Sequence, residues 1–404
     1  MKNLKTTGPL VLVIDAGTTN VKVFLINGEL DIAYRKTVAL GKWFPKRGWV
    51  EQNPEEIFGS VERLLREAIA ENKAFLERIV GLGITNQRET TVCWDRGTGR
   101  PIYPAIVWED ERTLRQCAAL SRRISNRKIR MKTGLTLAPY FSASKISWII
   151  QNVPRAKTLI SANRLAFGTV DSWLTFRLTG GKNHLTDFTN ASRTLLFNIR
   201  SLRWDRELLA LFEIPPAVLP EARPSFSFFG RLDEDIFGLG IPIMALAGDQ
   251  QASLYAAGAR PGVTKITYGT GAFILQNVGA RFFSDNHLFT TVAAGTKRVP
   301  LYALEGKVAG CGSLVAPILG RDREMKRAIA KIALKVNRLL RHFPKGYDKI
   351  IVDGGISQAN FMISEQGRVS KTPIQRQRHF EGTALGVAKL IIENMRVKSG
   401  SARR

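Results

Sequence analysis

The chain has 404 residues, of which 44% are hydrophobic, so it can bury a sizeable core in two domains. Its three cysteines are widely spaced and its four histidines are scattered, which argues against a disulfide framework and against a zinc centre. The apolar run over residues 10–14 is too short for a signal peptide or a membrane span. We therefore expect a cytoplasmic protein.

The formal net charge of +26 arises from 60 Lys and Arg residues against 34 Asp and Glu residues. A field of this sign attracts polyanions such as nucleotides, nucleic acid or anionic lipid. Basic residues cluster in 122–132 and in 321–349, and the second segment has apolar residues at helical spacing, which predicts an amphipathic helix. No nucleic-acid-binding motif accompanies either cluster, so we interpret both as solvated surface and do not expect nucleic acid as a partner.

Residues 10–40 alternate apolar and turn residues, which predicts two or three antiparallel strands. A helix is expected to begin at Pro54, with Asn53 as its N-cap. A buried strand that ends at Thr85 and a short strand over 92–95 follow. Strands that precede helices in this way favour α/β layers.

The pattern restarts near residue 243. Residues 243–248 predict a strand, 248–258 a turn into a helix, and 264–279 a hairpin centred on a Gly-Thr-Gly turn. Each half of the chain thus has its own Gly/Thr hairpin at the start of an α/β unit, which indicates a duplicated core. We place the domains at residues 1–254 and 255–404.

Residues 81–95 begin as a buried strand and turn abruptly polar at Arg88 and Glu89. A guanidinium beside a carboxylate supplies hydrogen-bond donors and acceptors at a fixed separation. A small polyhydroxylated molecule requires that arrangement, because each hydroxyl donates one hydrogen bond and accepts another. The alternative is a structural ion pair at the end of the strand.

The two Gly/Thr turns, in DAGTT (15–19) and YGTG (268–271), can bring backbone N–H groups and hydroxyls close to phosphate oxygens. Such turns are common in ordinary hairpins, but their matching positions in two half-domains favour phosphate binding. The chain has no GxxxxGK[ST] motif, so it is not a P-loop enzyme. Asp249 directly follows an apolar strand, where it is either a helix N-cap or the carboxylate that phosphoryl transfer to an alcohol needs.

The chain resembles the glycerol kinases of the FGGY carbohydrate kinase family in the segments VIDAGTTNVK (13–22), GLGITNQRETTVCWD (81–95), NASRT (190–194), LAGDQQ (246–251) and TKITYGTGAF (264–273). The resemblance covers about residues 10–305 and resumes at 351–360 and 381–388. It implies an α/β fold of two RNase H-like domains flanking a cleft. It also implies ATP-dependent phosphorylation of glycerol to sn-glycerol 3-phosphate, with Mg²⁺ as the metal.

The resemblance implies a role for each matching residue. Asp249 becomes the general base, and Asp15 the carboxylate that helps to hold Mg²⁺ through water. The implied polyol site consists of Arg88, Glu89, Tyr140, Asp249 and Gln250, with Trp108 and Phe273 flanking the carbon chain. The implied nucleotide site consists of Thr18, Thr19, Asn20, Lys22, Gly269, Thr270, Gly271, Gly354, Gly355 and Asn360.

The second domain is expected to be truncated, because relatives carry several dozen more residues between 303–306 and 353–355. The stretch that is absent here helps to shape the nucleotide pocket in those relatives. Two alternatives to a glycerol kinase therefore stay open. One is a kinase of another polyol or sugar in the same family, and the other is a degenerate, inactive homologue that binds a ligand or a polyanionic partner. A homo-oligomer is also left open.

Overall fold

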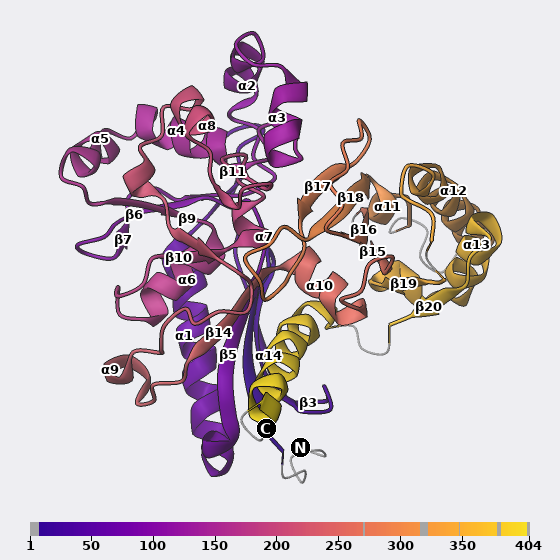
Figure 1. The fold of residues 1–404 in the computed structure, drawn as a ribbon, viewed down its shortest axis with the longest axis horizontal. Helices are drawn as coiled ribbons and strands as arrows, with labels where there is room; N and C mark the ends of the chain where they lie inside the picture. The colour runs from indigo at the N-terminus through magenta and orange to yellow at the C-terminus, as the bar shows by residue number, and fades with distance from the viewer. Residues whose placement is uncertain (1–7, 270, 316–321, 347, 378–380, 402–404) are drawn as a thin grey trace.

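The computed structural model describes residues 8–269, 271–315, 322–346, 348–377 and 381–401. Two sheets, each with helices packed against it, form the two halves of the molecule (Figure 1). The expected α/β fold is therefore confirmed.

The first sheet has five strands in the order β14-β5-β1-β2-β3. They are β1 (Leu10–Ala16), β2 (Asn20–Asn27), β3 (Ile32–Ala39), β5 (Ile79–Asn86) and β14 (Ile243–Gly248). β1, β2 and β3 are antiparallel neighbours, as predicted, whereas β5 runs parallel to both β1 and β14. Because carboxyl ends of parallel strands meet at one edge of a sheet, the residues after β1, β5 and β14 come together.

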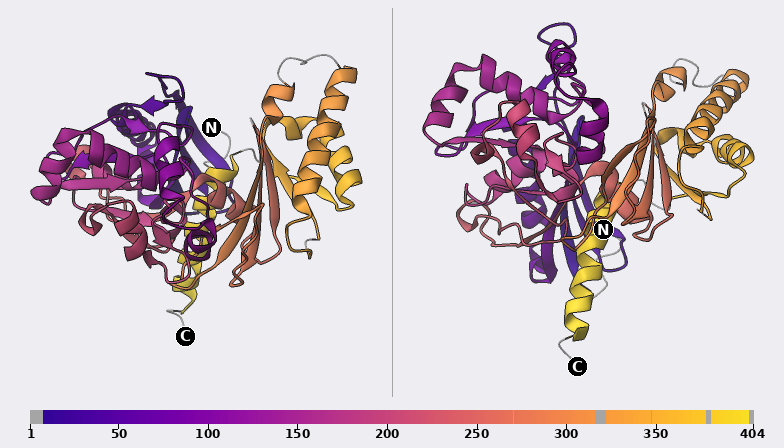
Figure 2. Two further views of the ribbon diagram at one scale, coloured as in Figure 1. Left: turned by 90° about the horizontal axis from the view of Figure 1, so that it is seen from above. Right: turned by 45° about the horizontal axis from the view of Figure 1, so that its top comes forward.

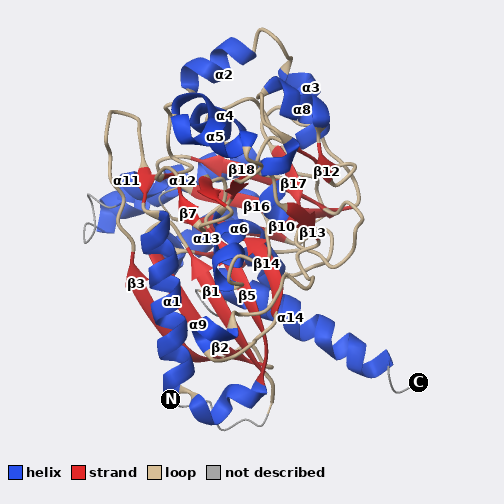
Figure 3. Cartoon of the chain, turned by 90° about the vertical axis from the view of Figure 1, so that its left-hand side faces the viewer, coloured by secondary structure: helices blue, strands red, loops and turns tan. Residues whose placement is uncertain are grey.

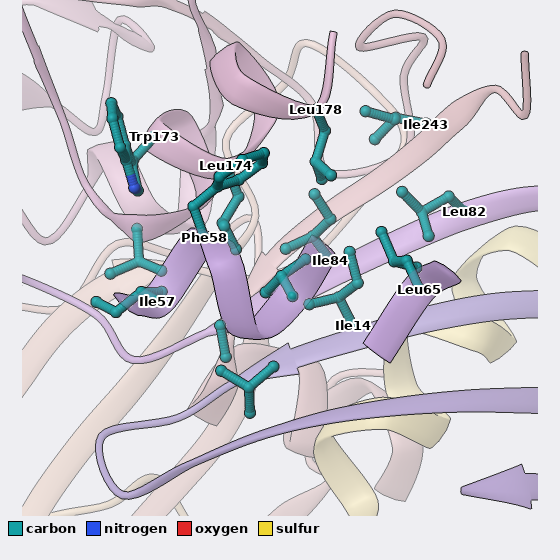
Figure 4. Close-up of a cluster of buried hydrophobic side chains, with 14 of the residues drawn as sticks. Ile14, Ile57, Phe58, Leu65, Leu82, Ile84, Trp173, Leu174, Leu178 and Ile243 are labelled. Carbon is teal, nitrogen blue, oxygen red and sulfur yellow. The ribbon is translucent and has the colours of Figure 1, made fainter. Parts of the chain in front are cut away.

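One face of the first sheet is covered by α1 (Pro54–Glu71) and α6 (Val170–Leu178). The α1 helix begins as predicted: the Asn53 side chain accepts a hydrogen bond from the Glu55 backbone N–H, and Pro54 lies in the first turn. Figure 4 shows the apolar side chains of both helices meeting those of the strands. This packing fixes the frame from which the site residues project.

A mostly helical region stands beside the first sheet and carries the segments around residues 108 and 140 (Figure 3). Its helices and short strands are β4 (Glu51–Gln52), β6 (Val92–Asp95), β7 (Arg100–Pro101), β8 (Ala105–Ile106), α2 (Leu114–Leu120), α3 (Asn126–Thr133), α4 (Ser142–Asn152), α5 (Pro154–Ser161), β9 (Leu165–Gly168), β10 (Leu185–Asp187), α7 (Phe188–Ala191), β11 (Phe197–Asn198), β12 (Arg203–Trp204), α8 (Arg206–Leu211) and β13 (Glu221–Arg223). The short helix α9 (Glu234–Phe237) instead packs with the core of the first sheet. The mostly helical region has a separate apolar core, so it is a rigid support for the side chains that it places in the site.

The second sheet has six strands in the order β17-β18-β16-β15-β19-β20. They are β15 (Thr264–Tyr268), β16 (Ala272–Gly279), β17 (Phe289–Val292), β18 (Tyr302–Val308), β19 (Ile350–Asp353) and β20 (Ile374–Arg376). Its helices are α11 (Cys311–Val315), α12 (Asp322–Leu340) and α13 (Asn360–Ser370), on the side away from the first half (Figure 2). The predicted amphipathic helix is α12, with Ile329, Ile332 and Val336 buried against the sheet.

Two helices connect the halves. α10 (Asp249–Ala257) leads from β14 to β15, and α14 (Gly382–Ser401) follows β20 and returns to the face of the first sheet opposite α1. The two helices cross closely, because a Cβ atom on Gly386 would lie only 1.8 Å from the Ala252 carbonyl oxygen. The domain boundary near residue 255 stays a prediction, but α14 packs with the first sheet. None of the helices in the described part of the chain could cross a membrane.

Candidate active site between the two sheets

Arg88 lies just beyond β5, and its side chain is 3% exposed. Its Nη1 and Nη2 donate to the carboxylate of Glu305 on β18 at 2.6 and 3.1 Å, and its Nε lies 3.2 Å from Asp249 Oδ1. A Cβ atom on Gly248 would come within 2.7 Å of Arg88 Cδ, so glycine at position 248 leaves room for the Arg88 side chain. Arg88 therefore joins the two sheets, and it does not form an ion pair with its neighbour Glu89.

Glu89 is buried and has a φ of 61°, an uncommon conformation for a residue with a side chain. Its Oε1 accepts a hydrogen bond from Arg193 Nε at 2.5 Å, and Arg193 Nη2 lies 3.2 Å from Glu305 Oε1. Charges thus alternate along Glu89, Arg193, Glu305 and Arg88. Burial alone would raise the pKa of Glu305, but Arg193 and Arg88 hold it at about 2.

The sequence analysis assigned no role to Arg193 or Glu305. Arg193 lies in the NASRT segment, and Glu305 is the acidic residue of the otherwise apolar β18 segment YALEG. A carboxylate after an apolar run is a signal for Glu305, because a buried carboxylate needs a partner, but Lys307 two residues later makes the strand equally compatible with a solvated face. Arg193 Nη1 is buried and has no hydrogen-bond partner among the described residues.

Asp249 is the first residue of α10, and the N-cap of that helix is Gly248, so the N-cap interpretation of Asp249 is not observed. Burial raises the pKa of Asp249 to about 6, against the opposing effect of Arg88. Gln250 follows directly, and its Oε1 is buried without a hydrogen-bond partner in the described structure. A carboxylate with this pKa can accept a proton near neutral pH.

The three aromatic residues predicted to line the polyol site lie close together. The ring centroids of Trp108 and Tyr140 are 5.6 Å apart in an edge-to-face contact. Lys307 Nζ lies 5.1 Å from the centroids of both Trp108 and Phe273, and 5.9 Å from that of Tyr140. The sequence analysis did not single out Lys307. We call Trp108, Tyr140 and Phe273 the aromatic wall. Trp108 Nε1 also donates to Thr18 Oγ1 at 3.0 Å, which joins the aromatic wall to the first hairpin.

The first Gly/Thr hairpin is the turn between β1 and β2. Gly17 N donates to Asn20 O at 2.9 Å, and Asn20 Nδ2 donates to Thr19 Oγ1 at 3.0 Å. Lys22, on β2, lies 2.7 Å from Glu381 Oε2 just before α14. Lys22 thus already has an acidic partner, and its predicted contact with phosphate stays a prediction.

Asp15 is the next-to-last residue of β1 and accepts a hydrogen bond from Thr383 Oγ1 at 2.7 Å. Burial raises its pKa, and the nearby charge of Glu381 adds to that effect. No group of three or more His, Cys, Asp or Glu side chains within the described ranges could hold a metal ion. Mg²⁺ commonly binds through one or two carboxylates, with waters and substrate phosphates completing its shell. A single buried carboxylate at this position fits that mode of binding.

On the nucleotide side, Gly269 N donates to Gly271 O at 2.8 Å across the second hairpin, while Thr270 lies outside the described residues. Gly354 has a φ of 90°, and a Cβ atom there would lie 2.2 Å from the Tyr268 carbonyl oxygen. A glycine is therefore required where β19 ends beside the second hairpin. The structure thus brings Gly354 close to the hairpin, as the predicted nucleotide site requires.

Two further residues of the predicted nucleotide site, Gly355 and Asn360, follow β19 and are more open. A Cβ atom on Gly355 would meet nothing within 4 Å. Asn360 begins α13, and its Oδ1 accepts from Arg376 Nη2 at 3.1 Å in an exposed contact. A cavity of about 660 Å³ lies at the opposite, amino ends of β15 and β19, so it is separate from these two residues.

Residues 10–256 match the N-terminal domain of the FGGY family of carbohydrate kinases, and this chain belongs to that family. A glycerol kinase of Carboxydothermus hydrogenoformans is 45% identical over 76% of this chain, which spans 62% of that relative's length. A glycerol kinase of Bacillus cytotoxicus is 43% identical, over 94% of this chain and 89% of the relative.

Solved structures show the same fold. The crystal structure of Plasmodium falciparum glycerol kinase with ADP matches with a TM-score of 0.89 and 30% identity, over 96% of this chain and 91% of that one. A gluconate kinase from Lactobacillus acidophilus matches with a TM-score of 0.83 at 19% identity, which shows the fold alone. The expected fold of two RNase H-like domains is thereby confirmed.

Proposed function

We propose that this protein transfers the γ-phosphoryl group of ATP to glycerol and forms sn-glycerol 3-phosphate. The observation that carries the proposal is the buried charge network of Arg88 and Glu305 beside Asp249. It presents fixed donors and acceptors at the edge of the first sheet, next to an aromatic wall. The relatives with the name glycerol kinase support glycerol as the substrate. A cytoplasmic location is part of the same proposal.

Two buried polar atoms in this region suit hydroxyl groups. Gln250 Oε1 can accept a hydrogen bond and Arg193 Nη1 can donate one, and both lack partners within the described residues. Because a buried polar atom without a partner costs about 1–3 kcal/mol, a polyol that supplies the missing partners is stabilised there. The rings of Trp108 and Phe273 would cover its C–H surface.

In the proposed reaction Asp249 is the general base. A glycerol hydroxyl loses its proton to the Asp249 carboxylate as its oxygen attacks the γ-phosphorus. Arg88, whose Nε lies 3.2 Å from Asp249 Oδ1, would hold the carboxylate in place and favour its ionised form. The aromatic wall would exclude water, which limits hydrolysis of ATP.

The two hairpins would hold the phosphate chain of ATP. Backbone N–H groups near Gly269 and Gly271 would bind the nucleotide phosphates, and the hydroxyls of Thr18 and Thr19 would approach the transferred group. Gly354, Gly355 and Asn360 would form the edge of the adenosine site. Asp15 would hold Mg²⁺ through water, and the ion would neutralise phosphate charge when bound.

An assay of ADP release with a panel of substrates tests the proposal. Wild-type protein with ATP and Mg²⁺ should turn over glycerol in preference to erythritol, xylulose and gluconate, and Asp249→Asn should serve as the inactive control. Preference for a sugar or another polyol would favour the kinase alternative. A folded protein that binds glycerol but releases no ADP with any of them would favour the inactive homologue.

A further inference from the structure

Lys307 lies on β18 two residues after Glu305, so both side chains project from the same face of the strand. It is the direct partner of Phe273 in the antiparallel β16–β18 pairing. Its ammonium group lies within 6 Å of three ring centroids, those of Trp108, Tyr140 and Phe273. Such contacts attract a cation to a ring face, so three rings from both halves of the molecule hold this charge in one place.

The ammonium group lies beside both hairpins. The Cε atom of Lys307 would be 3.6 Å from a Cβ atom on Gly271, in the second hairpin. Trp108, which contacts the ammonium, donates a hydrogen bond to Thr18 in the first hairpin. A group that moves from a nucleotide at the second hairpin to a polyol at the aromatic wall must therefore pass close to Lys307.

Two other cations of the proposed site already have acidic partners. Arg88 contacts Glu305 and Asp249, and Lys22 contacts Glu381. No ion pair joins Lys307 to a carboxylate in the parts of the chain that the structure describes, and the residue is exposed. Its effect on the pKa of Glu305 is small, because Arg193 and Arg88 lower that pKa more strongly than Lys307 does. The charge of Lys307 remains available for an anionic ligand, and the rings would orient it without neutralising it.

We propose that Lys307 is a catalytic residue that binds the transferred phosphoryl group and offsets its charge; this rests on the proposed function. In the transfer, the bond from the γ-phosphorus to the β,γ-bridging oxygen breaks, and a bond from the glycerol oxygen to that phosphorus forms. The hydroxyl proton goes to Asp249, ADP leaves with the electron pair of the broken bond, and Lys307 keeps its proton.

Three variants test this role. Lys307→Met removes the charge and retains most of the side-chain length, and Lys307→Arg retains the charge. Lys335→Met is the matched control, because Lys335 is an exposed lysine of the same groove of about 420 Å³. Calorimetry with glycerol and, separately, with sn-glycerol 3-phosphate distinguishes contact with the polyol from contact with the phosphoryl group. The turnover of glycerol is measured in parallel.

We expect Lys307→Met to weaken binding of sn-glycerol 3-phosphate by about 10- to 100-fold, as for loss of a charged hydrogen bond, and to lower turnover at least as much. Glycerol binding should stay within about twofold, Lys307→Arg should restore part of the loss, and Lys335→Met should match wild type. Unchanged binding of sn-glycerol 3-phosphate by Lys307→Met would overturn the proposal.

Tighter glycerol binding with faster turnover in Lys307→Met would also overturn it, because Lys307 would then obstruct the polyol site. A failure of the proposed function would give a different experimental result. A wild-type protein without glycerol turnover that still binds sn-glycerol 3-phosphate through Lys307 would reject the reaction and keep the phosphoryl contact.

Discussion

The polyol side and the nucleotide side of the site are built in different ways. On the polyol side, long charged side chains from β5 and β18 contact each other, as in the pair Arg88–Glu305. On the proposed nucleotide side, the features are backbone turns: Gly269 N donates across the second hairpin, and glycine at position 354 permits a close approach to Tyr268. Side-chain networks fix donors and acceptors in place before a ligand arrives, whereas a turn acquires its specificity from the segments around it.

Buried ion pairs occur on both sides, but they join different parts. Lys265 Nζ lies 2.7 Å from Asp353 Oδ1, and this pair joins the neighbouring strands β15 and β19 of one sheet. Arg88–Glu305 instead joins the two sheets. On the proposed polyol side, a buried ion pair therefore joins the two sheets, and the predictions below test that difference.

The largest effect is expected from Asp249→Asn. Turnover of glycerol should fall by about 10²–10⁴-fold because the general base is lost, while glycerol binding changes little. Steady-state ADP release and calorimetry with glycerol check the two parts. Turnover above about a tenth of the wild-type value would remove Asp249 from its role as base.

Glu305→Gln should lower the free energy of unfolding by about 3–5 kcal/mol, because it leaves Arg88 and Arg193 buried with less opposite charge. Urea denaturation measures the change. Glu221→Gln is the control, since its partner Arg223 is on the surface and such a pair contributes about 0–1 kcal/mol. Equal losses in the two variants would contradict the structural importance of the network.

The pH profile of kcat/KM for glycerol should have an acid limb set by Asp249, whose pKa is about 6. The carboxylate accepts a proton only when it is ionised, so kcat/KM should be level above this pKa and fall about tenfold for each pH unit below it. Initial rates across the acid range give the profile. A rate that stays constant well below this pKa would show that another group accepts the proton.

The smallest effect is expected on the nucleotide side. In the presence of glycerol and Mg²⁺, ATP, GTP and inorganic triphosphate should bind within about 10-fold of one another, equivalent to ~1.4 kcal/mol. The hairpins are proposed to bind phosphate, but adenine needs a shaped apolar slot, and the second domain is expected to be truncated. Competitive titration measures the three affinities. Strong selectivity for ATP would show that the loop near Gly354 and Asn360 forms such a slot.

The sequence alone predicted the strands of the first sheet and the β15–β16 hairpin of the second, but not the strands β17 to β20. Apolar runs that stop at Asp15, Arg88 and Asp249 place polar groups at strand ends, and parallel pairing brings those ends together. The resemblance added the aromatic wall, and the structure places Trp108 and Phe273 around one ammonium group.

The partners of these groups could not be predicted in the same way. Glu305 and Lys307 alternate along one strand, and that pattern is equally compatible with a solvated face. They reach the site only because the second sheet faces the first. The pairing of Lys22 with Glu381 joins residues 359 positions apart, so only the tertiary structure reveals it.

The close crossing of α10 and α14 has a mechanical consequence. The chain passes between the halves next to both helices, and the contact of Gly386 with Ala252 brings their backbones together. A relative rotation of the halves would therefore pivot near this crossing. Asp249 begins one of the two helices and Thr383 lies in the first turn of the other, so the proposed proton acceptor and the partner of Asp15 lie near this crossing. They would move least while the two hairpins approach or separate.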